Sequence, residues 1–99
     1  MTRKASQAFE FGQLEVLKDP EQAALYLEKI LADGDIDLFK EALKDVAAAR
    51  VGNMTTLAKK TRLARESLYT SLSRKGNPRL DTLTKVLDAA GLRLTVTTA

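Results

Sequence analysis

Apolar residues recur at helical spacing through most of this 99-residue chain, and this spacing limits the fold more than any other feature. Asp19-Pro20 suits a helix start, with aspartate as cap and proline in the first turn. The apolar side chains that follow lie three or four positions apart, namely Ala23, Tyr26, Leu27, Ile30 and Leu31. Such a stripe covers one face of an α-helix. The sequence therefore predicts a helix over residues 20–34, ended by Gly34.

Two further helices of similar character are expected. One opens at Asp35 or Asp37 and runs to about Arg50, where Gly52-Asn53 stops it. Its apolar face holds Phe39, Ala42, Leu43 and Val46. The other covers residues 80–90 and ends at Gly91. Its predicted inward face holds Leu80, Leu83, Leu87 and Ala90.

Two short helical patterns lie between these longer ones. Thr55 can cap the first, the second follows Arg62, and the turn Gly76-Asn77-Pro78 comes after both. Two short helices joined by a tight turn form a helix-turn-helix, in which the second helix lies in the major groove of DNA. We therefore predict a helix-turn-helix at 54–74. Its inward apolar residues would be Leu57, Ala58, Leu63, Leu68 and Leu72.

Both ends of the chain are expected to be extended. Residues 1–18 form an arm in which Phe9 and Phe11 alternate with polar neighbours, and LRLTVTT near the end has the alternation of a half-buried strand. A lone strand is unstable, so this one would pair with the arm, with a second copy or with another protein. The expected fold is mainly α, with a single five-helix domain at 19–99, an extended N-terminal arm and a short C-terminal β-strand.

Charge divides the chain into two unlike halves. Residues 1–50 contain 7 basic and 10 acidic side chains, a net charge of −3, whereas residues 51–99 contain 9 basic and 3 acidic, a net charge of +6. Within Met54–Arg79 there are seven Lys and Arg against one acid. A basic half joined to an acidic half indicates two surfaces with different partners, and the basic surface favours a polyanion.

Several classes of protein are disfavoured by composition. The chain has no cysteine and no histidine, which removes disulfides, thiol chemistry, the commonest zinc ligand and the commonest general base. No cluster of acids and nucleophiles stands at catalytic spacing, so we expect no enzyme activity, no cofactor and no metal. No apolar run reaches the roughly 20 residues that cross a bilayer, and no secretory signal opens the chain, so a cytoplasmic protein is expected.

The chain resembles a known family over residues 36–96. LFKEALKDVAAAR, MTTLAKKT and RESLYTSLSRKGNPRLDTLTKVLDAAGLRLTV are similar to the antitoxin, or addiction module antidote, branch of the Cro/C1-type (XRE) helix-turn-helix family, often called HigA-like. The acidic segment ending ILADGDIDLF is also similar to this branch. The resemblance implies a DNA-binding antitoxin of a type II module. Such a protein neutralises a RelE/ParE-like (HigB-type) toxin by direct binding and represses its own operon.

Two residues depart from the family pattern. Arg62 stands where the turn usually has glycine, and a non-glycine residue with positive φ costs roughly 1 kcal/mol. Ala64 replaces the usual serine cap of the second helix, which forfeits about 1 kcal/mol. Both changes concern the tightness of the turn, and Arg62 could add a phosphate contact.

The residues expected to touch DNA follow from the helix-turn-helix. Arg65 could bind guanine with two hydrogen bonds, and Glu66 could accept from cytosine or hold Arg65. Tyr69 could contact thymine or phosphate, or pack on the helix pair. Backbone contacts would come from basic side chains, including Lys60 and Arg79. The full set predicted to bind DNA is Thr55, Thr56, Lys59, Arg62, Arg65, Glu66, Ser67, Tyr69, Thr70, Ser73, Arg74 and Lys75.

Dimer and partner contacts are expected elsewhere. A helix-turn-helix monomer touches few base pairs, so we expect a homodimer on two half-sites. The candidate dimer or partner contacts are Phe9, Phe11, Tyr26, Leu27, Ile30, Leu92, Leu94 and Val96. Two alternatives stay open. One is a prophage-type repressor without a toxin partner, and the other is a protein-interaction module that has lost DNA binding.

Overall fold

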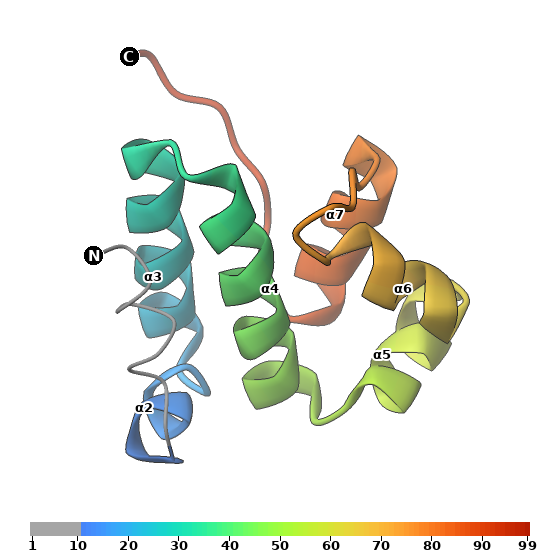
Figure 1. The fold of residues 1–99 in the computed structure, drawn as a ribbon. Coiled ribbons are helices and arrows are strands. Elements are labelled where there is room, and N and C mark those ends of the chain that lie inside the picture. Colours follow the sequence, from blue (N-terminus) through green and yellow to red (C-terminus); the bar gives the residue numbers. More distant parts are fainter. Residues whose placement is uncertain (1–10) are drawn as a thin grey trace.

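The computed structural model describes residues 11–99, with side chains from Leu14 onward, and this part of the chain is helical (Figure 1). Its six helices are α2 (Phe11–Val16), α3 (Pro20–Asp33), α4 (Ile36–Val51), α5 (Met54–Thr61), α6 (Arg65–Ser71) and α7 (Leu80–Ala89). The five predicted helices are all present. None of the helices in this part is long and apolar enough to cross a membrane.

Helices α3 and α4 form an antiparallel hairpin along one side of the molecule (Figure 1). The Asp19 carboxylate accepts a hydrogen bond from Glu21 N at 2.9 Å and Pro20 opens α3, as predicted. Gly34 ends α3 in the left-handed conformation, with φ of 82°. Asp35, rather than Asp37, caps α4 by accepting from Leu38 N at 2.9 Å. The hairpin is therefore closed by caps within its own sequence.

The core lies where α3, α5 and α7 pack against α4. The predicted inward residues of α4 are all buried, and so are Leu57, Leu68 and Leu72 at 0% exposed. The prediction for Leu80 was wrong, since this first residue of α7 is 65% exposed. The buried face of α7 instead lies toward the other end of the helix, at Val86, Leu87 and Ala90.

Arg50 at the end of α4 joins three distant segments. Its Nε donates to the Ala90 carbonyl at 2.8 Å, at the end of α7. Its Nη1 donates to the Lys18 carbonyl, between α2 and α3. One guanidinium thus links the turn between α2 and α3 to the end of α7 across the end of α4.

The two ends differ from the sequence prediction. Residues 11–16 form α2 rather than an extended arm, because Leu14 and Leu17 are spaced for a helix that packs toward α4 and leaves Leu17 only 1% exposed. Phe9 lies outside the described residues, and only the backbone of Phe11 is described. The predicted C-terminal strand was also wrong. No strand occurs among residues 11–99, and the tail beyond Leu92 has no partner there with which to form a ladder.

Candidate nucleic-acid interface

The pair α5–α6 lies where the sequence predicts a helix-turn-helix, and its two short helices are joined by a tight turn. Helix α5 is eight residues long, α6 is seven, three residues separate them, and the two helices contact each other. Thr55 was predicted to cap α5, and this prediction was wrong. The chain turns two residues earlier, and the Asn53 carboxamide accepts from Thr56 N at 2.8 Å. The Thr55 side chain is consequently exposed on the outer surface of the pair.

The turn between the helices is held by Thr61, which sequence reasoning missed. Thr61 is 5% exposed; its Oγ1 donates to the Leu57 carbonyl at 2.8 Å and accepts from Leu63 N at 3.3 Å. Next comes Arg62 with φ of 62°, the one non-glycine residue with positive φ among residues 11–99. The strained turn expected at Arg62 is therefore present. Thr61 stabilises it by pairing backbone groups on both sides.

Helix α6 is anchored by its inner face and leaves its outer face open. As expected from the sequence, Ala64 at its N-cap makes no side-chain hydrogen bond. Leu68 and Leu72 are fully buried beneath the helix. The outward side chains Arg65, Glu66, Ser67, Tyr69 and Thr70 are all exposed. The residues predicted to read bases thus share one accessible surface.

Arg65 lies at the centre of a small cluster on that surface, with Tyr69 and Thr55. Its guanidinium carbon sits 5.9 Å from the centroid of the Tyr69 ring, within the range of a cation–π contact. Its Nη1 lies 3.4 Å from Thr55 Oγ1, a long hydrogen bond between α6 and α5. These contacts orient the guanidinium and leave most of its five N–H donors available.

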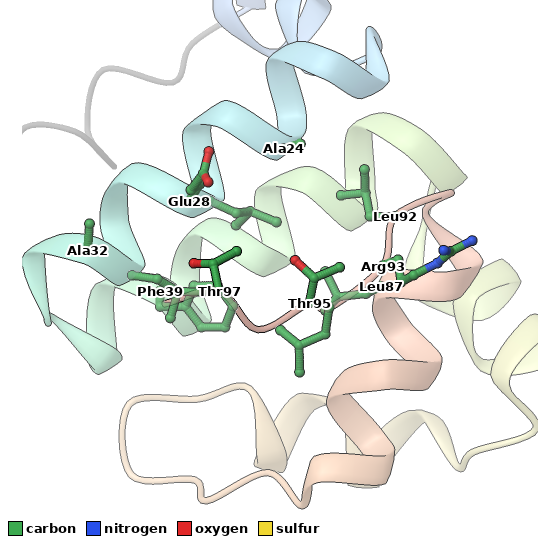
Figure 2. Close-up of a pocket in the computed structure, with 12 residues that line it drawn as sticks. Ala24, Glu28, Ala32, Phe39, Leu87, Leu92, Arg93, Thr95 and Thr97 are labelled. Carbon is green, nitrogen blue, oxygen red and sulfur yellow. The ribbon is translucent and has the colours of Figure 1, made fainter. Parts of the chain in front are cut away.

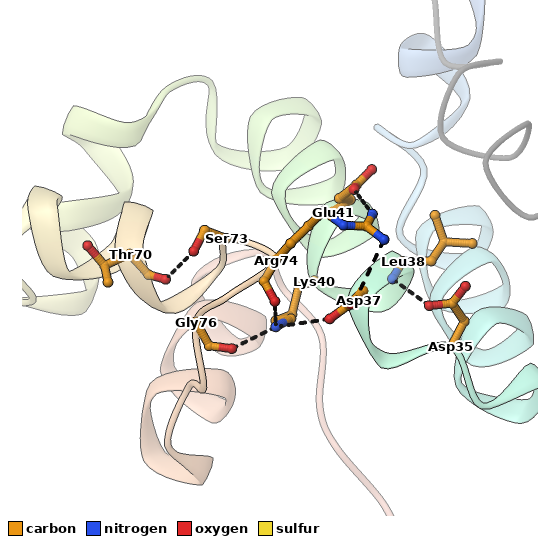
Figure 3. Close-up of polar contacts among 9 residues, drawn as sticks. All are labelled: Asp35, Asp37, Leu38, Lys40, Glu41, Thr70, Ser73, Arg74 and Gly76. Carbon is orange, nitrogen blue, oxygen red and sulfur yellow. Dashed lines mark hydrogen bonds and ion pairs between the residues drawn. The ribbon is translucent and has the colours of Figure 1, made fainter.

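The segment after α6 is tied back to α4 (Figure 3). The Arg74 guanidinium lies 2.8 Å from Glu41 Oε2 and 3.8 Å from Asp37 Oδ2, so acids already hold this predicted phosphate contact. The Ser73 hydroxyl donates to the Thr70 carbonyl at 2.7 Å. Besides Arg65, the exposed cations of α5, α6 and the loops beside them that make no carboxylate contact in the described residues are Lys59, Lys60, Arg62 and Lys75.

Lys40 is the buried cation that positions this segment, and sequence reasoning overlooked it. Its Nζ donates to the carbonyls of Arg74 at 2.9 Å and Gly76 at 2.6 Å, and lies 3.3 Å from Asp37 Oδ1. The residue is 4% exposed. A signal was present, because Lys40 stands three residues before Leu43 and seven before Ala47, on the buried face of α4.

Gly76 is required by a close approach of the backbone. A Cβ at this position would lie 2.0 Å from the Thr70 carbonyl oxygen and 2.5 Å from that of Ser71. Both contacts are with backbone, which cannot move aside as a side chain would. Gly76 therefore lets the chain after α6 fold back against the helix end, where Lys40 reaches its carbonyl.

Comparison with known proteins adds the family. The family model described as "Probable addiction module antidote protein" matches residues 7–98. The chain belongs to this family. A protein of Haemophilus influenzae (strain ATCC 51907 / DSM 11121 / KW20 / Rd), named only as an uncharacterized protein, is 40% identical over 87 residues, which is 88% of each chain. No solved structure matches the chain.

Membership in an antidote family implies a toxin as partner. The partner contacts predicted on α3 are Tyr26, Leu27 and Ile30. Leu27 and Ile30 are 5% and 4% exposed and belong to the core. The exposed apolar side chains on α3 are their neighbours Leu25 and Leu31, at 58% and 40%. Tyr26 is half-buried. The surface of α3 open to a partner is therefore next to the predicted one.

Two acids of α4, Asp45 and Glu41, lie near Tyr26 of α3. Burial, together with the nearby Glu41 carboxylate, raises the pKa of Asp45 to about 6, and Lys44 opposes this shift. Burial and the carboxylates of Asp45 and Glu41 also raise the pKa of Tyr26 above its usual value. These groups crowd negative charge on α4. Among residues 11–99, no three acids come close enough to hold a metal ion.

Proposed function

We propose that this member of the antidote family is a DNA-binding antitoxin. In this proposal it acts as a homodimer, binds a RelE/ParE-like (HigB-type) toxin through its acidic half and represses its own operon through α5–α6. It works by binding and catalyses no reaction. The HigA-like resemblance of residues 36–96 and the family membership support the part of the proposal that concerns toxin binding.

The observation that supports DNA binding most is the outer face of α6. Arg65, Tyr69 and Thr70 are exposed there, while Leu68 and Leu72 fix the helix from beneath. Arg65 can offer two parallel N–H donors to a guanine, the pairing that arginine forms most often in the major groove. The exposed lysines of α5 and the loop after α6 supply charge for phosphates.

Binding to the chain's own upstream region tests this half. Wild type is expected to bind that duplex with an affinity that falls as salt rises. Arg65→Ala should weaken binding by roughly 1–3 kcal/mol, or about 5- to 150-fold. Lys85→Ala, which removes one exposed charge from α7, serves as the matched control and should bind nearly as wild type. Absence of salt-dependent binding by the wild type would contradict the proposal.

The toxin half rests on charge complementarity between an acidic surface and a basic RNA-cleaving partner. Removing residues 1–34 would be a poor test, because α3 buries Ala23, Leu27 and Ile30 in the core. Reversing two exposed carboxylates of α3, in the double variant Glu21→Lys and Glu28→Lys, keeps the core intact. This variant should lose rescue of growth from the toxin while DNA binding persists.

A double variant with the same change in net charge provides the control. Asp81→Lys with Asp88→Lys alters two exposed acids of α7, away from the α3 surface. Rescue should survive in this control. Equal loss in both variants would mean that net charge alone matters, and unchanged rescue in both would remove α3 from the contact.

One alternative has structural support. A protein-interaction module without DNA binding would tolerate a seven-residue α6, which spans only about 10 Å, and an Arg74 already held by Glu41 and Asp37. The duplex-binding experiment separates the two, since this alternative expects no salt-dependent complex. A prophage-type repressor would bind DNA but copurify with no toxin from its native operon.

A further inference from the structure

Arg74 links the basic half of the chain to the α3–α4 hairpin (Figure 3). Its Nη1 lies 2.8 Å from Glu41 Oε2, and its Nη2 lies 3.8 Å from Asp37 Oδ2. The two acids stand four residues apart on α4, so their side chains share one face of that helix. Between Met54 and Lys75, Arg74 is the one cation that contacts a carboxylate in the described part of the chain. Two carboxylates thus neutralise this guanidinium, as a phosphate group would.

This pairing is particular to Arg74. Another arginine of the basic half, Arg93, lines the groove between α3 and the C-terminal tail, residues 93–99, together with Glu28 of α3 (Figure 2). These two residues form no ion pair in the structure of residues 11–99. Lining one groove with an acid of the hairpin is therefore not enough to hold an arginine, whereas Asp37 and Glu41 are placed to do so.

The ion pairs of Arg74 are open to water. The exposed fraction of the side chain is 54% for Arg74, 46% for Asp37 and 21% for Glu41. Water and salt screen such pairs and leave them weak, so a DNA phosphate can take the place of the carboxylates. Asp37 would stay paired after this exchange, because its Oδ1 also lies 3.3 Å from Lys40 Nζ. Arg74 can therefore leave Asp37 without stranding that carboxylate.

Only the side chain of Arg74 has to move in this exchange. Lys40 Nζ donates to the backbone carbonyls of Arg74 at 2.9 Å and of Gly76 at 2.6 Å, which fixes the backbone of the loop. The neighbouring Lys75 is exposed and makes no ion pair in the described residues, so the loop already offers one cation to a phosphate. An Arg74 side chain that turns away from α4 would add a second.

We propose that Glu41 and Asp37 compete with DNA phosphates for Arg74, so that the α3–α4 hairpin lowers the DNA affinity of α5–α6 in the same chain. The inference rests on the proposed DNA binding and states how the strength of that binding is set. A carboxylate that instead directed Arg74 toward a phosphate would raise the affinity. The two roles therefore have opposite consequences when Glu41 loses its charge.

A double-mutant cycle at Glu41 and Arg74 measures the competition. Wild type, Glu41→Gln, Arg74→Ala and the double variant are each titrated with the duplex upstream of the chain's own gene. Glu41→Gln keeps the shape of the side chain and removes its charge. It should tighten binding by about 2- to 5-fold, the usual strength of an exposed ion pair. In the Arg74→Ala background the same substitution should leave the affinity unchanged.

The salt dependence of binding gives a second measurement. One additional phosphate contact steepens the slope of log K against log salt by about 0.9. The slope for Glu41→Gln should therefore be steeper than that of wild type by up to this amount, and the slopes of the two variants that carry Arg74→Ala should be equal. Glu41→Ala, which removes the amide as well, should give the same gain as Glu41→Gln.

Asp33→Asn, at an exposed acid of the same hairpin, is the matched control and should bind as wild type does. Weaker binding by Glu41→Gln would mean that Glu41 positions Arg74 for DNA. An equal gain with and without Arg74 would mean that net charge alone sets the affinity. Either outcome, or an unchanged affinity of Glu41→Gln, overturns the inference.

An unrelated duplex of equal length separates this inference from the proposed function. Arg74 would contact phosphates, which every duplex presents, so the gain in Glu41→Gln should appear on both duplexes. Equal binding of the two duplexes with the gain preserved would remove only the proposed repressor. Preference for the upstream duplex without the gain would remove only the competition for Arg74. No binding of either duplex by any variant would overturn both.

Discussion

The α3–α4 hairpin and the α5–α6 pair end their helices in opposite ways. Asp19 and Asp35 each accept a backbone N–H at the start of a hairpin helix, and a left-handed glycine closes α3. In the second pair, α5 ends at a left-handed arginine and α6 begins at an alanine whose side chain accepts no hydrogen bond. The hairpin follows local rules for helix ends, whereas the α5–α6 pair breaks two of them.

This difference shows where each region obtains its stability. The hairpin is specified largely by its own caps and apolar stripe. The α5–α6 pair depends on burial of Leu57, Leu68 and Leu72. The segment directly after α6 is held by Lys40 of α4. Departures from local rules are expected where a surface is kept for function, because other contacts then compensate. Four measurements test this difference between the two regions.

The largest effect is expected at Leu68, the fully buried anchor of α6. Leu68→Ala should lower the free energy of unfolding by about 2–5 kcal/mol, since it removes buried apolar contacts and leaves a cavity. Urea denaturation followed by circular dichroism measures this change. Leu80→Ala is the control and should shift stability by less than about 0.5 kcal/mol, because Leu80 is 65% exposed. Similar losses in both variants would contradict the assigned burial.

A smaller loss of folding stability is expected for Lys40→Met. The substitution keeps most of the side chain's length but leaves the carbonyls of Arg74 and Gly76 without their donor. Removing one partner of buried hydrogen bonds costs about 1–3 kcal/mol. Hydrogen exchange should show the loss concentrated in α6. Lys44→Met on the same helix is the control and should leave the hydrogen exchange of α6 unchanged. If Lys44→Met speeds the exchange of α6 as much as Lys40→Met does, the hydrogen bonds of Lys40 are not what stabilises α6.

Asp45 should make the free energy of unfolding depend on pH. Because burial raises its folded pKa to about 6 from 3.8, the folded state holds more protons than the unfolded state between about pH 4 and 6. The free energy of unfolding should therefore fall as pH rises through this window. Asp45→Asn should remove that part of the pH dependence. It should also raise stability at pH 7 by about 1 kcal/mol, an amount reduced by the group's partial exposure.

Unfolding titrations at several pH values between 4 and 7 test the prediction for Asp45. Asp88→Asn, at an exposed position on α7, is the matched control and should follow the wild-type curve. If stability changes with pH at the same slope in wild type and in the Asp45→Asn variant, the pKa of this carboxyl is not raised in the folded state.

The missing cap of α6 is expected to have the smallest effect. Ala64→Ser supplies an acceptor for a free N–H of the first turn and should stabilise the chain by about 1 kcal/mol. Thermal unfolding measures the gain. Ala48→Ser, at an exposed position inside α4, should give none. If Ala64→Ser also fails to stabilise, the start of α6 already has another partner for its N–H groups.

Periodicity predicted the helices well because each helix buries a face of its own. The stripe of α4 led to the correct residues, and that of α3 was right for Ala23, Leu27 and Ile30 but wrong for Leu31, which is 40% exposed. The family resemblance, rather than periodicity, marked Arg62 and Ala64 at the turn before α6. The ends of the chain were harder. Alternation around Gly12 suggested an extended arm, but burial of Leu17 favours a helix, and LRLTVTT cannot form a strand alone.

The parts of the candidate site that depend on contacts between residues far apart in the chain could not be predicted from the sequence. The position of Lys40 on the apolar face of α4 indicated burial, but nothing near Lys40 or Arg74 in the sequence shows that the two meet near Asp37. Gly76 was predicted as a turn residue, while its real constraint is the approach of two carbonyls of α6. Arg65, Tyr69 and Thr70 were placed on the outer surface correctly, because helical spacing alone decides that.

The reach of Lys40 has a consequence for synthesis of the chain. Its two carbonyl acceptors lie 34 and 36 residues later in the sequence. Translation at about 5–20 residues per second delivers Gly76 roughly two to seven seconds after Lys40. Until then Lys40 lacks both of its carbonyl acceptors. The buried cation of the acidic hairpin can therefore be satisfied only after α5 and α6 have been made.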